Sequence, residues 1–433
     1  MDGFIDNQGN FGADGIVGPH HEKEGSFYTI KQLWSPVQIM NTSVDKQFDG
    51  KFSVENRYDF LNLNTCRFLW KQVKFPTATD ASNTTAQVLK QGEVQGSDVA
   101  AHSAGVLDIK TTILPDADAL FLTAIDRYGH ELWRWTFPVN KLNQANEVLS
   151  PLSNKVTENE LTVKAKNHTF IFSKKDGQLK GVSVNNRKIS FANGPRFIGA
   201  RRADRSLDQF YNHDDEKAKE KDRTYSEFPD AAVFTKLDVK EDGGNLIVTA
   251  DYKLGNLDKV QWTINPNGEA VLDYTYNFSG VVDLMGICFD YPEDQVISKR
   301  WLGAGPYRVW QNRIHGTQYD VWENDYNDPI PGETFTYPEF KGYFGSVSWM
   351  NIRTKEGTIS LTNETPDAYI GVYQPRDGRD RLLYTLPESG ISVLNVIPPV
   401  RNKVNSTDLC GPSSQPKWVN GPQSGRIIFR FME

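Results

Sequence analysis

The segment HTFIFSKKDGQLKGVSVNNRKI (168–189) decides the fold class. Two runs of alternating apolar and polar residues flank Asp176-Gly177, a dipeptide that strongly favours a two-residue hairpin turn. Alternation with a period of two residues is typical of strands that have one buried and one solvated face. The segment therefore predicts an antiparallel β-hairpin, and β-rich sequence lies both upstream and downstream of it.

The same alternation continues downstream of this hairpin. No period of fixed length recurs, which argues against a propeller or a solenoid. Residues from about 160 to 433 are therefore predicted to form one large antiparallel sandwich. The charged run HDDEKAKEKDR (213–223) is expected to be a solvated loop or short helix face rather than a metal cluster. The further strand segments are LIVTADYKL (246–254), VQWTINPNGEAVLDYTYNF (260–278), GTISLTN (357–363), YIGVYQ (369–374) and RIIFRF (426–431).

A second β-rich region lies upstream of the hairpin. The run GKFSVENRYDFLNLNTCRFLWKQV (50–73) predicts strand, turn and strand, and the polar stretch 77–92 is expected to be a loop. Further strands follow in GVLDIKTTI (105–113) and ALFLTAIDRYGHELWRWTFPV (119–139). These strands predict a sandwich of about 100 residues, the size of an immunoglobulin-like domain, followed by a linker SPLSNK (150–155).

One helix is predicted near the start, in KEGSFYTIKQLW (23–34), after a loop over residues 1–22. Phe27, Ile30 and Trp34 have helical spacing, Ser26 is the expected cap, and a proline follows shortly after the helix. A helix this short is marginal in water by itself and needs a surface to pack on. We expect residues 1–35 to be partly disordered or to pack on the first sandwich or another chain.

Composition and charge exclude several classes of function. The 433 residues carry a net charge of −7, which argues against nucleic acid or an anionic membrane as partner. No run of 18 apolar residues predicts a membrane helix, and no signal-peptide pattern opens the sequence. If the chain is bacterial, both periplasm and cytoplasm stay open. Cys66, Cys288 and Cys410 lie far apart and are expected to be separate thiols.

Three segments together carry a family resemblance. They are NFGADGIVGPHHEKEGSFYTIKQLWSPV (10–37), the hairpin at 168–189, and SKRWLGAGPYRVWQNR (298–313) with its W-L-G-x-G-P pattern. In order and spacing, essentially the whole chain resembles the C-terminal third of a glycoside hydrolase family 2 enzyme of the β-galactosidase type. The resemblance implies that residues 1–35 are the last loop and helix of a TIM barrel. It also implies an immunoglobulin-like domain at 36–150 and a galactose-mutarotase-like supersandwich at 151–433.

The resemblance also implies a function. Both catalytic glutamates of the family lie on barrel strands upstream of the matching segments, so the chain is expected to be the non-catalytic C-terminal portion, supporting the barrel. Its expected partners are a β-glycoside and the N-terminal catalytic domains, or a chain that carries them. A stand-alone carbohydrate-binding module and the small subunit of a two-chain β-galactosidase are the alternatives. A chain that begins inside a barrel unit favours a divided or truncated enzyme over a free module.

A metal site is implied at the start of the chain. The family binds sodium through a phenylalanine carbonyl and an asparagine, at the positions of Phe11 and Asp14 here. A carbonyl and a carboxylate suit a hard cation, although a partial set of ligands rarely holds one. The neighbouring His20-His21 pair could bind zinc, but two adjacent histidines alone do not complete a tetrahedral site, and hydrogen-bonded loop histidines are expected.

Exposed aromatic residues are the candidates for sugar binding. Tyr307, Trp310 and Trp322, with Tyr326, follow the W-L-G-A-G-P segment in polar company and could stack on a sugar or pack between domains. Trp301 is expected in the core, and Gly303, Gly305 and Pro306 in a tight turn.

Two departures from the family pattern concern the substrate. Trp418 in STDLCGPSSQPKWVNG (406–421) is a loose substitute for a family tryptophan that reaches the active site in a G-G-D-x-S-W pattern. The stretch RFIGARRADRSLDQ (196–209) likewise replaces a W-R-A-P-T-D-N-D-like segment. Together they suggest a β-linked glycoside other than a galactoside.

Overall fold

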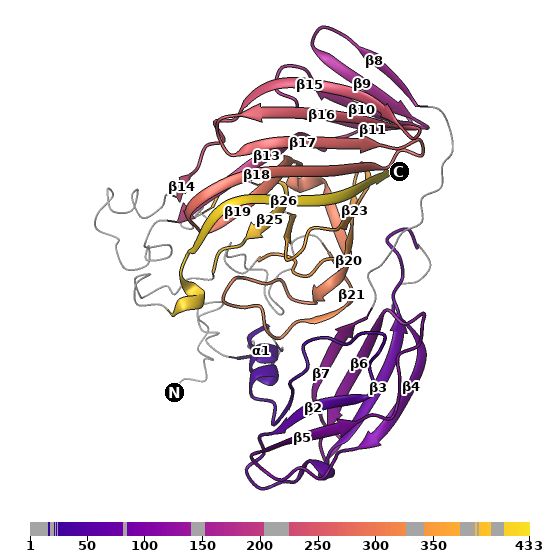
Figure 1. Ribbon diagram of the computed structural model, residues 1–433, viewed down its shortest axis with the longest axis vertical. Helices are drawn as coiled ribbons and strands as arrows, with labels where there is room; N and C mark the ends of the chain where they lie inside the picture. Colours follow the sequence, from indigo (N-terminus) through magenta and orange to yellow (C-terminus); the bar gives the residue numbers. More distant parts are fainter. Residues whose placement is uncertain are drawn as a thin grey trace, which may run out of the picture.

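The computed structural model is nearly all β, as the sequence predicts (Figure 1). Two bodies of antiparallel strands are visible, the first below and the second above in the view of Figure 1, with the helix α1 (Gly25–Leu33) beside their junction. The prediction of an all-β sandwich fold is confirmed. The described residues are 16–17, 21, 23, 25–80, 85–139, 152–202, 225–325, 342–372, 386–387, 389–399 and 411–433.

The first body consists of two small sheets with the strand orders β1-β2-β5 and β4-β3-β6-β7. Aliphatic residues and a few aromatic rings fill the space between them, with Phe52 and Phe137 only 4.9 Å apart between ring centroids. The strands are β1 (Val37–Ile39), β2 (Lys51–Asn56), β3 (Arg67–Lys74), β4 (Gln87–Gln95), β5 (Ser103–Asp108), β6 (Ala119–Ile125) and β7 (Glu131–Pro138).

The prediction of strand, turn and strand over 50–73 is confirmed, and its turn passes from one sheet to the other, because β2 pairs with β5 whereas β3 pairs with β4 and β6. The prediction of a loop over 77–92 is wrong from Gln87 onward, where β4 begins. This strand lies at the edge of its sheet and exposes most of its side chains, and only Leu89 and Val94 pack against the core. The predicted linker likewise contains the exposed strand β8 (Ser153–Val156).

The second body consists of two large sheets. The ten-stranded sheet has the order β24-β25-β19-β13-β11-β10-β9-β8, with β12 and β14 pairing beside it, and the nine-stranded sheet has the order β15-β16-β17-β18-β26-β23-β22-β20-β21. The first contains β9 (Glu160–Ala165), β10 (His168–Ser173), β11 (Leu179–Val184), β12 (Arg187–Ile189), β13 (Ala192–Arg202), β14 (Tyr225–Glu227), β19 (Leu284–Asp290), β24 (Tyr369–Val372) and β25 (Ile391–Val396). The second contains β15 (Val233–Asp242), β16 (Asn245–Lys253), β17 (Leu257–Ile264), β18 (Ala270–Val282), β20 (Val296–Gly305), β21 (Gln318–Asp325), β22 (Trp349–Thr354), β23 (Gly357–Asn363) and β26 (Lys417–Met432).

The hairpin of β10 and β11 forms as predicted, and its turn contributes to the core. Gly177 has φ = +73°, a conformation that favours glycine. A side chain at this position would also lie 2.8 Å from Phe234 and Ala250 of the other sheet. The turn therefore packs closely against the other sheet at a place where a side chain does not fit without a shift.

The helix α1 is shorter than the predicted segment and begins at Gly25. Ser26 lies inside its first turn, so the prediction that Ser26 caps the helix is wrong. The apolar stripe is only partly covered, since Trp34 is 78% exposed. No helix in the described residues has both the length and the apolar character needed to cross a membrane.

Candidate functional site

The two bodies meet at an apolar interface built around the W-L-G segment. Leu302 of β20 and Trp349 of β22 pack with Phe75 and Phe121 of the first body. The Trp349 indole Nε1 donates a hydrogen bond to the Pro76 carbonyl at 3.1 Å. Leu302 and Trp349 are fully buried, so the interface removes apolar side chains of both bodies from contact with water.

Polar contacts at the same interface fix its register. Asn351 donates from Nδ2 to the Ala78 carbonyl at 2.7 Å. Arg134 forms an ion pair with Asp320 at 2.9 Å, and its guanidinium lies 4.6 Å from the centroid of the Phe121 ring. Because Arg134 belongs to β7 and Asp320 to β21, the pair connects the edge strands of two different sheets.

The helix α1 contacts both bodies. The Thr29 hydroxyl donates to the His315 carbonyl at 2.9 Å, and the Gly316 amide donates to Gln32 Oε1 at 2.6 Å. On the other side, Lys31 pairs with Glu131 of β7 at 2.9 Å. The expectation that this segment packs on the first body is thus met, and the helix also packs on the loop that follows β20.

Two of the aromatic sugar-binding candidates lie in or near this loop. Tyr307 packs on the helix, with its ring 5.3 Å from that of Tyr28 and its hydroxyl donating to the Lys23 carbonyl at 2.8 Å. Trp310 is only 1% exposed and lies edge-on against Tyr343, 5.5 Å between centroids. Trp310 is therefore a core residue, and its indole is directed inward rather than toward solvent.

Trp322 and the motif glycine Gly305 form a close contact. The Trp322 indole donates to the Gln318 carbonyl at 3.0 Å and lies directly over Gly305, where a side chain would approach it to 2.4 Å. Gly303 and Gly305 belong to β20 and do not have positive φ, so the prediction that they form a tight turn is wrong. The two glycines are needed instead because other groups approach the backbone closely. The Trp322 indole lies against Gly305, and the backbone of residues 345–347 lies against Gly303. Trp301 is fully buried, and its predicted core position is confirmed.

Trp418 differs from the other candidates because it is 70% exposed. It lies on β26 opposite Val281 of β18, on the solvent side of the nine-stranded sheet. An accessible indole face can stack on a sugar ring. Its role in sugar binding stays a prediction.

The predicted metal ligands fall outside the described part of the chain. Phe11, Asp14 and His20 lie there, as do Tyr326, Cys410 and the charged run 213–223. In the described residues, no group of three or more histidine, cysteine, aspartate or glutamate side chains could hold a metal ion. Cys66 and Cys288 are buried free thiols, and burial raises the pKa of Cys288 to about 11.

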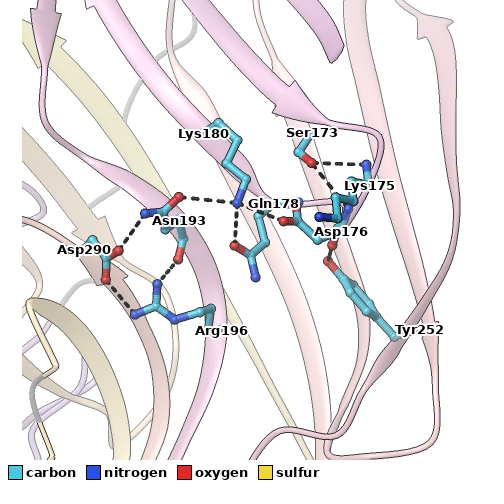
Figure 2. Close-up of polar contacts among 9 residues, drawn as sticks. All are labelled: Ser173, Lys175, Asp176, Gln178, Lys180, Asn193, Arg196, Tyr252 and Asp290. Atoms are coloured by element: carbon cyan, nitrogen blue, oxygen red, sulfur yellow. Dashed lines mark hydrogen bonds and ion pairs between the residues drawn. The ribbon is translucent and has the colours of Figure 1, made fainter. Parts of the chain in front are cut away.

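A row of charged and amide side chains crosses the ten-stranded sheet (Figure 2). Lys180 lies 2.9 Å from Asp176 and donates to Asn193 Oδ1 at 3.4 Å. Asn193 Nδ2 in turn donates to Asp290 at 2.7 Å, and Arg196 contacts the other oxygen of Asp290 at 2.7 Å. Sequence reasoning missed this row because its members come from β13, the end of β19 and the hairpin.

Each carboxylate of the row is satisfied by a cation. Burial raises the pKa of Asp290, but hydrogen bonds from Arg196 and Asn193 outweigh it, and the pKa lies below its ordinary value. For Asp176, burial is likewise outweighed by Lys180 and by the Gln178 amide, so this pKa is also lowered. The row is a neutral ion-pair network that couples strands, with no carboxyl group poised to give up a proton.

The other notable carboxylates are also engaged. Asp273 accepts both hydrogen bonds of a bidentate contact with Arg426, at 2.9 Å each, and Glu364 lies 3.1 Å from Nε of the same guanidinium. Burial raises the pKa of Asp118 despite a hydrogen bond from the Phe75 amide. That carboxylate joins the start of β6 to the end of β3. A glycosidase needs two carboxyl groups in different environments across one cleft, and Asp118, Asp273 and Glu364 do not form such a pair.

Comparison with solved structures gives distant similarities. Galactose 1-epimerase from Lactobacillus acidophilus aligns with a TM-score of 0.34 and 9% identity, over 66% of this chain and 99% of that one. A copper-containing benzylamine oxidase from Hansenula polymorpha aligns with a TM-score of 0.26 and 7% identity, over 85% and 77% of the two chains. Scores this low carry no argument about the present chain.

Comparison at the level of sequence is more informative. A β-galactosidase from Priestia megaterium is 23% identical over 385 residues, which cover 84% of this chain and 35% of that protein. The chain thus spans about a third of the length of this relative. The family model described as "Beta galactosidase small chain" matches residues 164–396, more than half of the chain and nearly all of the second body up to β25. The chain belongs to the β-galactosidase small chain family.

Proposed function

We propose that the chain is the non-catalytic C-terminal portion of a glycoside hydrolase family 2 enzyme of the β-galactosidase type, acting in carbohydrate degradation. The observation that carries this proposal is the family match over residues 164–396. In this proposal the catalytic carboxylates belong to a barrel that the chain supports. The first body is the immunoglobulin-like domain, and the second is the supersandwich.

The arrangement of acidic side chains supports a non-catalytic role. In retaining glycosidases two carboxyl groups lie about 5–5.5 Å apart, one protonated and one ionised. Asp273 and Glu364 instead share the guanidinium of Arg426, which gives both the same environment. Asp118, whose pKa is raised, accepts a hydrogen bond from a backbone amide and holds two strands together.

The helix and the interface support a scaffolding role. The helix α1 is tied to the first body through Glu131 and to the second through His315 and Gly316. Its exposed end, with Leu33 and Trp34, is an apolar surface available to a further domain. A barrel packed there would be held by both bodies at once.

A second candidate is the small subunit of a two-chain β-galactosidase. The printed description of the matching family as a small chain favours it. The two candidates differ in the partner, which is either the same polypeptide or another one. Native mass spectrometry of the purified chain mixed with a separately expressed catalytic chain distinguishes them, because only the small subunit forms a stable complex that gains activity.

The test of the main proposal is turnover by the purified chain alone. We expect no hydrolysis of an aryl β-galactoside, with the intact Priestia megaterium β-galactosidase as positive control. Asp273→Asn and Glu364→Gln variants serve as checks on contamination, since contaminating enzyme is indifferent to them. Hydrolysis that copurifies with the chain and is lost in either variant would contradict the proposal.

A further inference from the structure

One edge of the ten-stranded sheet carries positive charge, in contrast to the rest of the chain. Residues 152–190 contain eight lysine and arginine side chains and three carboxylates, whereas the whole chain has a net charge of −7. This segment forms the strands β8 to β12, and β8 and β9 lie at the top of the molecule in Figure 1. A local charge opposite in sign to that of the chain indicates a surface for a negatively charged partner.

The register of the strands places several of these lysines on the solvent side of the sheet. One cross-strand row runs from β8 to β12, and its members are Ser153, Lys164, Thr169, Ser183 and Lys188. Lys155 lies two residues further along β8 on the same side, because side chains alternate along a strand. Val163 and Phe170 point to the other side and are fully buried. We call the solvent side around Lys155, Lys164 and Lys188 the basic face.

The lysines of the basic face have no carboxylate beside them. Across the described ranges, the side chains of Lys155, Lys164 and Lys188 take part in no ion pair or hydrogen bond. The edge strand β15 of the other large sheet differs, since its Lys240 lies 3.7 Å from Asp242. Charge is therefore balanced at the edge strand β15 and unbalanced at the edge strand β8.

The backbone of β8 supplies an independent observation. This strand is the last in the order of its sheet, and all four of its side chains are exposed. The Thr157 amide donates to the Glu160 carbonyl at 2.8 Å, so the alternation of an antiparallel ladder turns the amide and carbonyl groups of Asn154 and Val156 away from β9. No strand in the described part of the chain pairs with these groups. Such an edge can accept one further strand.

We propose that β8 binds an extended segment of another polypeptide in which acidic and apolar residues alternate. The segment adds a strand to the sheet through the outward backbone groups of Asn154 and Val156. Every second side chain of the segment lies on the basic face, where Lys155 attracts a carboxylate directly and Lys164 attracts it from the next strand. The intervening side chains lie beside Val156, which is 55% exposed and pairs with the fully buried Leu161.

The two observations together favour a polypeptide strand over other partners. A phosphate polymer or a lipid head group uses the charge of the basic face but leaves the outward amides of β8 unused. Pairing of β8 with β8 of a second copy brings the basic faces of both copies together, and the like charges oppose it. Lysine on an edge strand therefore rejects copies of this chain and selects an acidic strand.

The test is a fluorescence anisotropy titration of the full chain with a labelled peptide of about ten residues in which glutamate and valine alternate. A peptide of alternating lysine and valine is the charge control. We expect saturable binding of the glutamate peptide that weakens at high salt, and no binding of the lysine peptide. Bound glutamate peptide should also slow amide hydrogen exchange in residues 153–156, measured by mass spectrometry.

Two sets of variants test the two parts of the site. Lys155→Glu combined with Lys164→Glu reverses the charge of the basic face and should weaken binding about tenfold. The matched control combines Lys46→Glu with Lys71→Glu at exposed positions of the first body, and should weaken binding by less than about twofold, because distant charges are screened. Val156→Pro removes one outward amide at an edge position that tolerates proline, and should also weaken binding about tenfold.

Several outcomes would overturn the proposal. They are no binding of the glutamate peptide, equal weakening by the two pairs of lysine substitutions, and binding without slower exchange in residues 153–156. Inorganic polyphosphate and phosphatidylglycerol vesicles are the further probes, and binding of either as tightly as the peptide would show a general surface for anions instead. Urea denaturation of Val156→Pro is the control for folding, and the lysine substitutions decide the test if that variant is unstable. The inference goes beyond the proposed function, because binding of a strand at β8 requires no catalytic residue.

Discussion

The two bodies of the molecule differ in how many aromatic side chains their cores contain. Valine, isoleucine and leucine form most of both cores, but the second body adds a larger group of aromatic rings that contact one another. Phe289 illustrates this, with Phe191 at 4.5 Å and Phe429 at 5.6 Å between centroids. Larger sheets enclose more volume, and aromatic side chains bury more area per residue. We infer that the second body is stable by itself, and that the first gains from contact with it.

The largest effect is expected in the aromatic core. Trp262→Ala removes a fully buried ring that contacts Phe172, Phe289 and Phe429. The free energy of unfolding, measured by urea denaturation, should fall by about 3–5 kcal/mol. Phe60→Ala is the control, because Phe60 is 94% exposed, and it should change stability by less than about 0.5 kcal/mol. Equal effects of the two substitutions would refute the inferred difference between core and surface.

The next effect concerns the junction of the two bodies. Leu302→Ala leaves a cavity beside Phe75 and Trp349 and should cost about 2–4 kcal/mol, because the interface can partly relax. It should also separate the unfolding of the first body from that of the second in differential scanning calorimetry. Val106→Ala, at an exposed position of β5, should leave the calorimetric trace unchanged. A single transition at the original temperature in Leu302→Ala would show that the bodies do not depend on this contact.

The smallest effect is expected in the polar row of the ten-stranded sheet. The pKa of Asp290 is lowered in the folded state, so its ion pair stabilises the protein above the ordinary carboxyl pKa of about 4. This contribution disappears as the pH falls through the lowered pKa. Because Asp290 is half exposed, it should amount to less than about 1 kcal/mol.

Asp290→Asn tests this contribution. The variant should lose less stability than the original chain when urea denaturation is compared at pH 7 and near pH 2. Asp242→Asn, at an exposed contact with Lys240 on the other sheet, is the matched control and should follow the original pH dependence. An unchanged pH dependence in Asp290→Asn would mean that the row contributes nothing to stability.

Strands with one buried face could be predicted from sequence, and the hairpin at Asp176-Gly177 is the clearest case. Strands β4 and β8 could not, because each lies at a sheet edge, exposes most of its side chains and has no regular alternation of apolar and polar residues. Glycines in β20 were predicted to form a turn, since sequence does not distinguish a glycine needed for its φ angle from one needed for close approach.

The candidate sites were less predictable than the fold. Trp310 has polar neighbours in sequence, yet its side chain is directed into the core. The charged row of the ten-stranded sheet combines residues from the hairpin of β10 and β11, from β13 and from the end of β19, which are brought together only by strand order. Its members are ordinary polar residues on strand faces. A single sequence contains no signal for such a set unless the pairing of the strands is known.

The position of β26 has a consequence for biosynthesis. This strand runs between β18 and β23 and joins β15–β18 to β20–β23 within one sheet. Until residues 417–432 have left the ribosome, both halves present long unpaired edges, which are prone to wrong association. A nascent chain stalled before Lys417 should therefore depend on chaperones, and a premature stop codon there should give an insoluble product rather than a smaller folded protein.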